Sequence, residues 1–314
     1  MRPANVLSAE EIKSLTERSD LRGSVEIAHT WGWISFALVL SGLHPSPITV
    51  FISLWILGGK QLACAIIMHD TSHYALFRSK KANQIIGNWF GGFPILVDLN
   101  RYRPYHLKHH SHTGLDNDPD MNLTKGYPAG KWSFARKVLR DLSGLTGMKA
   151  FFGLMMMHSG HLEFNLGGEV IMSQRQSLFG YIMNFLRNMW GPIAANLFLA
   201  AVLIASGIGW TYWLWVIAYF TTYQFCLRIR SIAEHSVVPD HSDNHRNTRT
   251  TKANFLERLL FAPHFVNYHA EHHLLMTVPP YNLPRMHELI RERGYYKEGL
   301  LKDNYWSIIR LAIG

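Results

Sequence analysis

Eight histidines gathered in three short segments constrain the fold of this chain more than any other feature. The segments are "HDTSH" (69–73), "HLKHH" (106–110) and "HAEHH" (269–273). Together they cover 15 residues, where a chain with 18 histidines in 314 residues would hold about 0.9 by chance. Histidines spaced three or four positions apart lie on one face of a helix. The pattern therefore predicts that three distant segments meet at one site.

A metal site explains this clustering. Neighbouring imidazoles cannot all carry a charge at neutral pH, and a metal ion holds them in the neutral form. One zinc ion takes about four ligands and a haem only one or two axial residues, so eight histidines predict two metal ions. Imidazole suits iron, copper and zinc alike, which leaves the identity of the metal open. His235 in "RIRSIAEHS" is a ninth candidate, because it follows the last apolar segment closely.

Four segments are apolar enough to cross a bilayer, which needs about 20 residues per helical span. They cover roughly residues 25–43, 47–68, 190–208 and 210–227. The loops inside each pair, "HPSP" and "IGWT", carry no Lys or Arg, whereas the flanking segments carry many. Basic residues mark the cytoplasmic side, so we expect two helical hairpins with both termini and every histidine segment on that side.

Composition excludes several other classes of protein. The net charge is +9, but no basic stripe is interleaved with aromatic residues, which argues against nucleic-acid binding. Cys64 and Cys226 lie in apolar segments and predict neither a disulfide framework nor a cysteine metal site. Residues 1–24 are polar and mixed in charge, and we expect no signal peptide there.

Two segments between the hairpins are shorter and amphipathic. We expect residues 83–97, which are rich in glycine, to form a re-entrant or interfacial segment. Residues 149–160 predict a surface helix with Met and Phe toward lipid or core. Ordinary core packing is the alternative for both.

Three histidine segments in the order HxxxH, HxxHH and HxxHH closely resemble the membrane-bound fatty acid desaturase family. "HHSHTGLDNDPD" (109–120) and "VPPYNLPRMH" (278–287) are typical of its bacterial members, and the resemblance covers about residues 25–287. It implies an all-α integral membrane protein with four transmembrane helices under a cytosolic helical cap. We expect a single domain over residues 1–314, with the cap formed by residues 69–189 and 228–314. The resemblance also implies that the protein is located in a bacterial inner membrane.

The resemblance implies a non-haem di-iron centre, with O₂ as co-substrate and no catalytic residue beyond the metal ligands. In the wider superfamily a further ligand comes from the cytosolic end of the fourth span, which matches His235. The expected ligands are His69, His73, His106, His109, His110, His235, His269, His272 and His273.

Residues beside the ligands are candidates for orienting the rings, because a ligating histidine usually donates its other N–H to a carboxylate or carbonyl. These candidates are Asp70, His112, Asp118, Glu234, Asn267 and Glu271, with Asp116 and Asp120 nearby. We expect the other histidines to be mostly surface or capping residues: His29, His44, His158, His161, His241, His245, His264 and His287.

The implied reaction is O₂-dependent oxidation of a lipid, foremost the desaturation of a fatty acyl chain. A hydroxylase or ketolase acting on fatty acids, alkanes or carotenoids is the alternative within the superfamily. A zinc-dependent membrane hydrolase or a metal-binding receptor is the alternative outside it. The chain contains no haem or iron–sulfur segment, so a separate electron donor of the ferredoxin, rubredoxin or cytochrome b5 type is expected.

Overall fold

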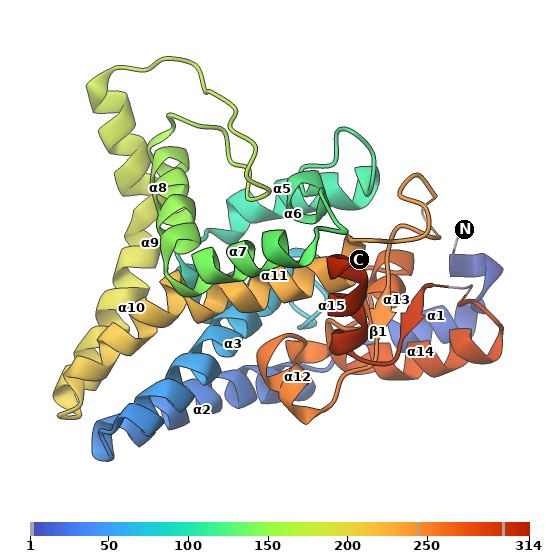
Figure 1. Ribbon diagram of the computed structural model, residues 1–314, viewed down its shortest axis with the longest axis horizontal. Helices are drawn as coiled ribbons and strands as arrows, with labels where there is room; N and C mark the ends of the chain where they lie inside the picture. The colour runs from blue at the N-terminus through green and yellow to red at the C-terminus, as the bar shows by residue number, and fades with distance from the viewer. Residues whose placement is uncertain (1–2, 244, 297–298) are drawn as a thin grey trace.

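The computed structural model describes residues 3–243, 245–296 and 299–314, and its fold is mainly helical (Figure 1). This confirms the helical fold class. The N-terminal half contains α1 (Ala9–Leu15), α2 (Asp20–Leu43), α3 (Pro47–Ser72), α4 (Lys80–Ile86), α5 (Leu99–His112), α6 (Met121–Thr124), α7 (Lys131–Leu142) and α8 (Leu145–Ser159). The C-terminal half contains α9 (Leu178–Ala205), α10 (Tyr212–Phe220), α11 (Thr222–His235), α12 (Phe255–Leu260), α13 (His269–Leu274), α14 (Leu283–Glu292) and α15 (Tyr305–Ile313). Two short strands, β1 (Thr250–Thr251) and β2 (Leu301–Lys302), pair in parallel.

The first hairpin, α2–α3, forms because its short loop supplies strong helix signals. Ser46 is the N-cap of α3 and its hydroxyl accepts a hydrogen bond from the Thr49 N–H at 3.2 Å. Pro47 follows at the first helical position, where its missing N–H costs nothing. Ser41 donates to Ser53 at 2.9 Å, which joins the two helices inside the apolar interface. The loop lies at the lower left of Figure 1, beside the one that follows α9.

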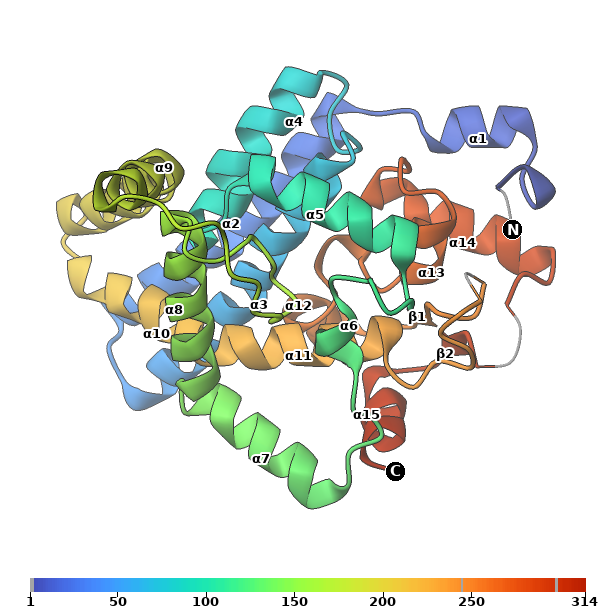
Figure 2. The same cartoon turned by 90° about the horizontal axis from the view of Figure 1, so that it is seen from above.

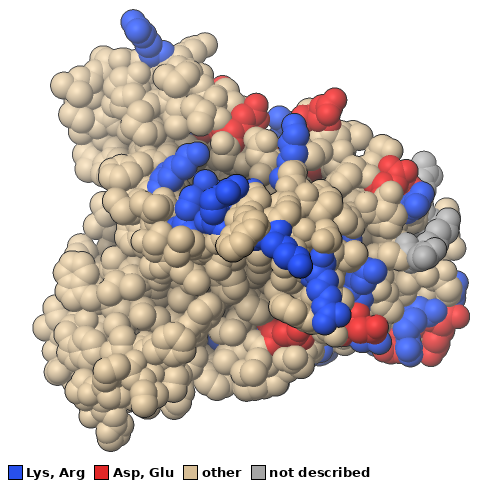
Figure 3. Space-filling view, in the orientation of Figure 1, with Lys and Arg blue, Asp and Glu red and all other residues tan. Residues whose placement is uncertain are grey.

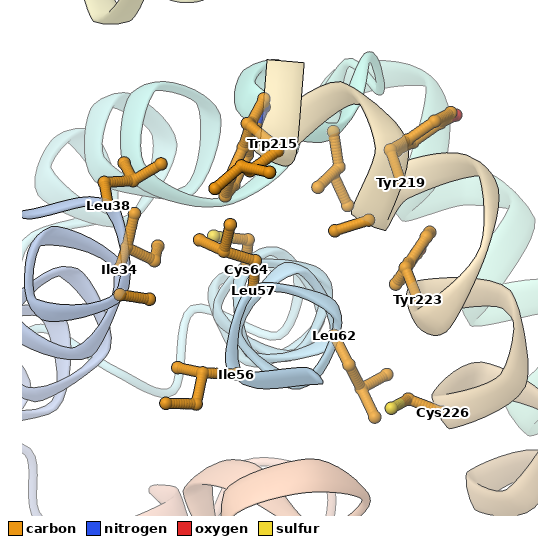
Figure 4. Packing of buried hydrophobic residues seen from close by; sticks show 14 of the residues in the cluster. Ile34, Leu38, Ile56, Leu57, Leu62, Cys64, Trp215, Tyr219, Tyr223 and Cys226 are labelled. Carbon is orange, nitrogen blue, oxygen red and sulfur yellow. The ribbon is translucent and has the colours of Figure 1, made fainter. Parts of the chain in front are cut away.

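α3 is the central helix of the molecule. Its buried side chains Leu57 and Cys64 pack between α2 on one side and α10 and α11 on the other (Figure 4). Trp215 of α10 and Cys226 of α11 complete this core. A glycine is required where α11 crosses, because a Cβ on Gly58 would lie 2.7 Å from the Thr222 carbonyl carbon.

Two helices among the described residues are long and apolar enough to cross a membrane. They are α3, with mean hydropathy 1.8, and α9, with mean hydropathy 1.6. α9 begins at Leu178, well before the expected start near residue 190. The expected span 210–227 is not a single helix: it is divided between α10 and α11, because Thr221 between them has φ −118° and ψ −89°. Neither part, at 9 and 14 residues, is long enough to cross alone.

The glycine-rich segment after α4 packs against α3. A π-helical turn covers Gly87–Gly92, and a Cβ on Gly91 would approach the Met68 backbone nitrogen at 2.8 Å. Trp89 and Phe90 in the same turn are exposed. The glycines therefore pack closely on α3, as the core-packing alternative expects, while the interfacial interpretation of residues 83–97 stays a prediction.

The two ends of the chain pack against helices from other parts of the molecule. α1 packs on α14 through Leu15, Met286 and Ile290, and α15 packs on α7 and α11 around Phe134 and Ile308. Seen from above, α5 and α13 lie on one side of α11, and α7 and α15 lie on the other (Figure 2).

Candidate metal centre

Four helices bring the expected ligands together. α3 ends at His69 and His73, α11 ends at His235, and α5 and α13 carry the two HxxHH segments. The nine side chains form two groups, and within each group the candidate ligand atoms all lie within 4.8 Å of one another. The first group is His69, His73, His106, His110 and His272, and the second is His109, His235, His269 and His273.

The two groups divide each HxxHH segment in the same way. Histidines four positions apart stay in one group, as His106 and His110 do on α5. The middle histidine of each segment, at i+3, belongs to the other group, so that His109 joins the second and His272 the first. α5 and α13 therefore each contribute to both groups, and they hold the two groups side by side.

The nitrogen–nitrogen distances fit a shared metal ion. Nε2 of His110 lies 3.0 Å from Nε2 of His106 and 3.1 Å from Nε2 of His272. In the second group, Nε2 of His269 lies 2.8 Å from Nε2 of His235. Adjacent octahedral ligands at roughly 2.1 Å from an ion have their nitrogens roughly 3.0 Å apart. The separations are those of neighbouring ligands around one ion.

Several ring nitrogens are buried with no hydrogen-bond partner among the described residues. These include Nε2 of His69, His73 and His273. A buried polar atom left without a partner is costly, and native proteins rarely retain one without a reason. A bound metal ion supplies that reason, so the residues present fit a metal pair.

In three of these histidines the other ring nitrogen, Nδ1, lies within hydrogen-bond distance of a residue outside the two groups. Nδ1 of His69 lies 2.8 Å from Asp70 Oδ1, and Nδ1 of His109 lies 2.8 Å from Asp118 Oδ1. Nδ1 of His235 lies 3.2 Å from the Asn247 carbonyl oxygen. Such partners fix the tautomer that leaves Nε2 free to bind a metal.

Burial keeps most of these rings neutral. It lowers the pKa of His106, His110, His272 and His273 well below the usual value, and neighbouring imidazoles add to the effect. Burial also lowers the pKa of His109, but its hydrogen bond with Asp118 and the charge of Asp120 outweigh this and raise the pKa. Neutral imidazole is the form that binds metal, so the lowered pKa values favour metal binding.

Glu234 lies beside the second group in an ion pair. Its Oε1 is 2.5 Å from Arg230 Nε and 3.6 Å from His269 Nδ1, which is too far for a hydrogen bond. This pair, His109 and His235 all line a cavity of about 20 Å³, which has room for about one water.

The other expected orienting residues do not contact a ligand ring. Nδ1 of His112 faces the Lys108 carbonyl, and Asn267 donates to the Thr251 carbonyl at 3.0 Å. Glu271 binds Nδ1 of His287 at 2.5 Å, and Tyr296 and Thr250 also donate to it. Glu271 therefore joins α13 to α14 and β1.

Three of the histidines expected outside the metal shell are buried, not on the surface. His158 lies 2.9 Å from the Leu96 carbonyl, His264 contacts Glu26 and Thr30, and His287 contacts Glu271. Each ring is satisfied by a hydrogen-bond partner, which is why burial is tolerated.

Sequence reasoning missed two residues that hold the end of α11. Arg249 is buried and donates to the carbonyl oxygens of Ser236 at 2.9 Å and Val237 at 2.5 Å, just after His235. A cation there offsets the partial negative charge of a helix C-terminus. Arg230 could have been found from its i,i+4 spacing to Glu234. Nothing in the sequence indicates that Arg249 contacts the backbone that follows the end of α11.

Comparison with known proteins agrees with this site. The family described as "Fatty acid desaturase" matches residues 43–306. The chain belongs to the fatty acid desaturase family. This confirms the resemblance carried by the histidine segments and identifies an oxidoreductase of a membrane-associated family that binds metal.

Desaturases from several bacteria are similar along most of their length. Dihydrorhizobitoxine desaturase of Bradyrhizobium elkanii is 26% identical over 302 residues, which cover 92% of this chain and 82% of that protein. The sn-1 oleoyl-lipid 12-desaturase of a Synechocystis species is 24% identical, covering 76% of this chain and 67% of the relative. The sn-1 oleoyl-lipid 12-desaturase of Anabaena variabilis is 23% identical, covering 82% of this chain and 73% of the relative.

Proposed function

We propose that the two histidine groups hold two iron ions and that this desaturase uses O₂ to introduce a double bond into a fatty acyl chain. The observation that carries the proposal is the division of nine histidines into adjacent groups of five and four. Two reduced irons and O₂ supply an oxidant strong enough to remove hydrogen from an unactivated methylene.

In this proposal the protein's own residues position and insulate the site. His69, His109 and His235 present Nε2 inward because Asp70, Asp118 and the Asn247 carbonyl hold Nδ1. The buried helices around the groups exclude bulk water, which would otherwise compete for the ligand positions.

The names of two relatives support an acyl substrate attached to a lipid, because both are oleoyl-lipid desaturases. The third relative is named for dihydrorhizobitoxine instead. We propose a membrane lipid as the substrate and a separate electron donor, of the ferredoxin, rubredoxin or cytochrome b5 type, on the side that holds the metal.

We propose that α2, α3, α9 and the α10–α11 pair are the membrane part of a single domain, with both termini and the metal site in the cytoplasm. The lower left of the face in Figure 3, over the ends of α2, α3 and α10, is nearly without charged side chains. Accessibility of single cysteines tests this orientation. His44→Cys should react with an impermeant maleimide from outside, and His112→Cys only after permeabilisation; labelling of both from one side would contradict it.

Metal and lipid analysis test the reaction. We expect two irons per purified chain and, in lipids of an expressing host, a product lighter than its precursor by two hydrogens. One zinc and no iron would overturn the di-iron proposal. A product heavier by one oxygen would replace desaturation with hydroxylation.

A matched pair of variants tests the ligand set. His110→Ala should lose iron and product, because it removes a member of the first group. His112→Ala, two residues along the same helix, should keep both, because its ring faces the Lys108 carbonyl. Equal loss in both variants would show that damage to α5, not ligation, explains the result.

A further inference from the structure

α7 presents three different faces along its 12 residues. Its first face is fixed to the protein core: Phe134 packs with Ile229 and Ile232 of α11. On the same face, the Asp141 carboxylate accepts hydrogen bonds from Arg228 Nε at 2.5 Å and Nη2 at 2.8 Å. This buried anchor sets the rotation of α7 about its own axis.

The second face is apolar and uncovered among the described residues. Trp132 is 83% exposed and Leu139 is 68% exposed, and Leu142 is exposed beside them. With Ala135 these residues are spaced i, i+3, i+7 and i+10, which places them in one stripe along the helix. Large apolar side chains exposed in a stripe mark an interaction surface.

The third face is basic. Arg136 and Arg140 are exposed and lie four positions apart, on the side of the apolar stripe away from the core face. Basic side chains also form a band across the middle of the face in Figure 3. An apolar stripe flanked by arginines is typical of a helix that lies in a membrane–water interface.

The next helix also exposes apolar side chains. α8 follows α7 after a two-residue turn and exposes Leu145, Met148 and Phe152 at i, i+3 and i+7. α8 packs against α9, which is apolar and mostly exposed along its length. The apolar stripe of α7 therefore lies near a helix long enough to cross a bilayer.

We infer that α7 lies in the cytoplasmic interface of the bilayer, with its apolar stripe at the acyl boundary and Arg136 and Arg140 on anionic lipid phosphates. The inference rests on the proposed membrane orientation. The link to α9 through α8 and the sign of the charge favour lipid over a protein partner, because the cytoplasmic leaflet is negatively charged. α7 thereby fixes the depth of α11 and of His235 relative to the lipid surface.

Fluorescence quenching tests the position of α7. An environment-sensitive dye is attached to Leu139→Cys in the full-length protein, reconstituted in phosphatidylcholine with or without phosphatidylglycerol. The unsubstituted chain is the labelling blank, because Cys64 and Cys226 are buried. We expect blue-shifted emission that is strongly quenched by nitroxide-labelled lipid. The same dye at exposed Glu288→Cys on α14 should be quenched by aqueous iodide instead.

The lipid specificity is tested by replacing both arginines. Phosphatidylglycerol should increase the quenching at position 139, and Arg136→Gln with Arg140→Gln should remove that increase while leaving the basal quenching. Quenching of Leu139→Cys by iodide alone, in protein that retains iron and desaturase activity, would overturn the inference without affecting the proposed function. An increase that survives the double substitution would overturn the role of the arginines.

Discussion

Asp118 holds the ring of His109 more completely than any other carboxylate at the site. Besides the 2.8 Å contact with His109, it accepts hydrogen bonds from the backbone N–H of Gly114 at 2.9 Å and of Asp120 at 2.9 Å. Asp118→Ala should therefore weaken metal binding about 10–100-fold, the usual cost of losing a partner behind a metal ligand. Iron affinity measured by chelator competition checks this.

Asp116→Ala is the matched control for this substitution. Asp116 lies in the same loop but is exposed, so its removal should leave iron affinity unchanged. If the Asp118 variant binds iron as tightly as the control, its hydrogen bond to His109 does not orient a ligand.

At the scale of elements, α13 is too short to be stable alone. It has six residues, and isolated helices below about 12–15 residues are marginal in water. Glu271 ties it to α14 through His287 and to β1 through Thr250. Removing a buried acceptor leaves its donors unsatisfied, at about 1–3 kcal/mol each.

We therefore expect Glu271→Ala to lower both thermal stability and iron content, although Glu271 touches no expected ligand ring. Thermal unfolding in detergent and iron analysis check the two effects. Glu288→Ala on α14 is the control, because Glu288 is exposed and, among the described residues, its ion pair is with its neighbour Arg291. A Glu271 variant that retains full iron and stability would show that α13 is held by its apolar contacts.

The crossing of α3 and α11 depends on Gly58. Gly58→Ala would place a Cβ against the Thr222 backbone, and overpacking of this kind typically costs about 1–3 kcal/mol. Gly32→Ala on α2 meets nothing within 4 Å and should be neutral or slightly stabilising, because alanine favours helix. Unfolding midpoints compared between the two variants check this; equal midpoints would show that the crossing can relax.

For the whole molecule, the histidine site makes stability depend on pH. Burial lowers the pKa of His106, His110, His269, His272 and His273 in the folded, metal-free protein. Below about pH 6.5 the unfolded chain binds protons that the folded chain does not, so stability falls as the pH falls. The raised pKa of His109 acts in the opposite direction, but it is a single group.

The metal-free protein should therefore melt at a lower temperature at pH 5 than at pH 7. Loss of iron should accompany acidification of the loaded enzyme, because protonated imidazole cannot bind metal. Differential scanning fluorimetry and iron release over this range check both. A melting temperature that rises on acidification would mean that His109 dominates.

The sequence alone determined the family, the helical class and the histidines that meet. Local spacing carries this information, because residues three or four apart share a helix face whatever surrounds them. It also predicted the α2–α3 hairpin, whose Ser-Pro signal is local. The sequence did not predict the division of the last apolar segment at Thr221, which occurs where Thr222 crosses Gly58 of α3.

The tertiary structure decided which histidine joins which group. His109 and His272 each belong to a different group from the other two histidines of their own segment, because α5 and α13 face one another across the site. It also decided that Glu271 stabilises α13 while Asp70 and Asp118 orient rings. Adjacency in sequence places a carboxylate near a ligand, but its direction depends on helix rotation and on partners such as His287 and Gly114, which only packing brings into reach.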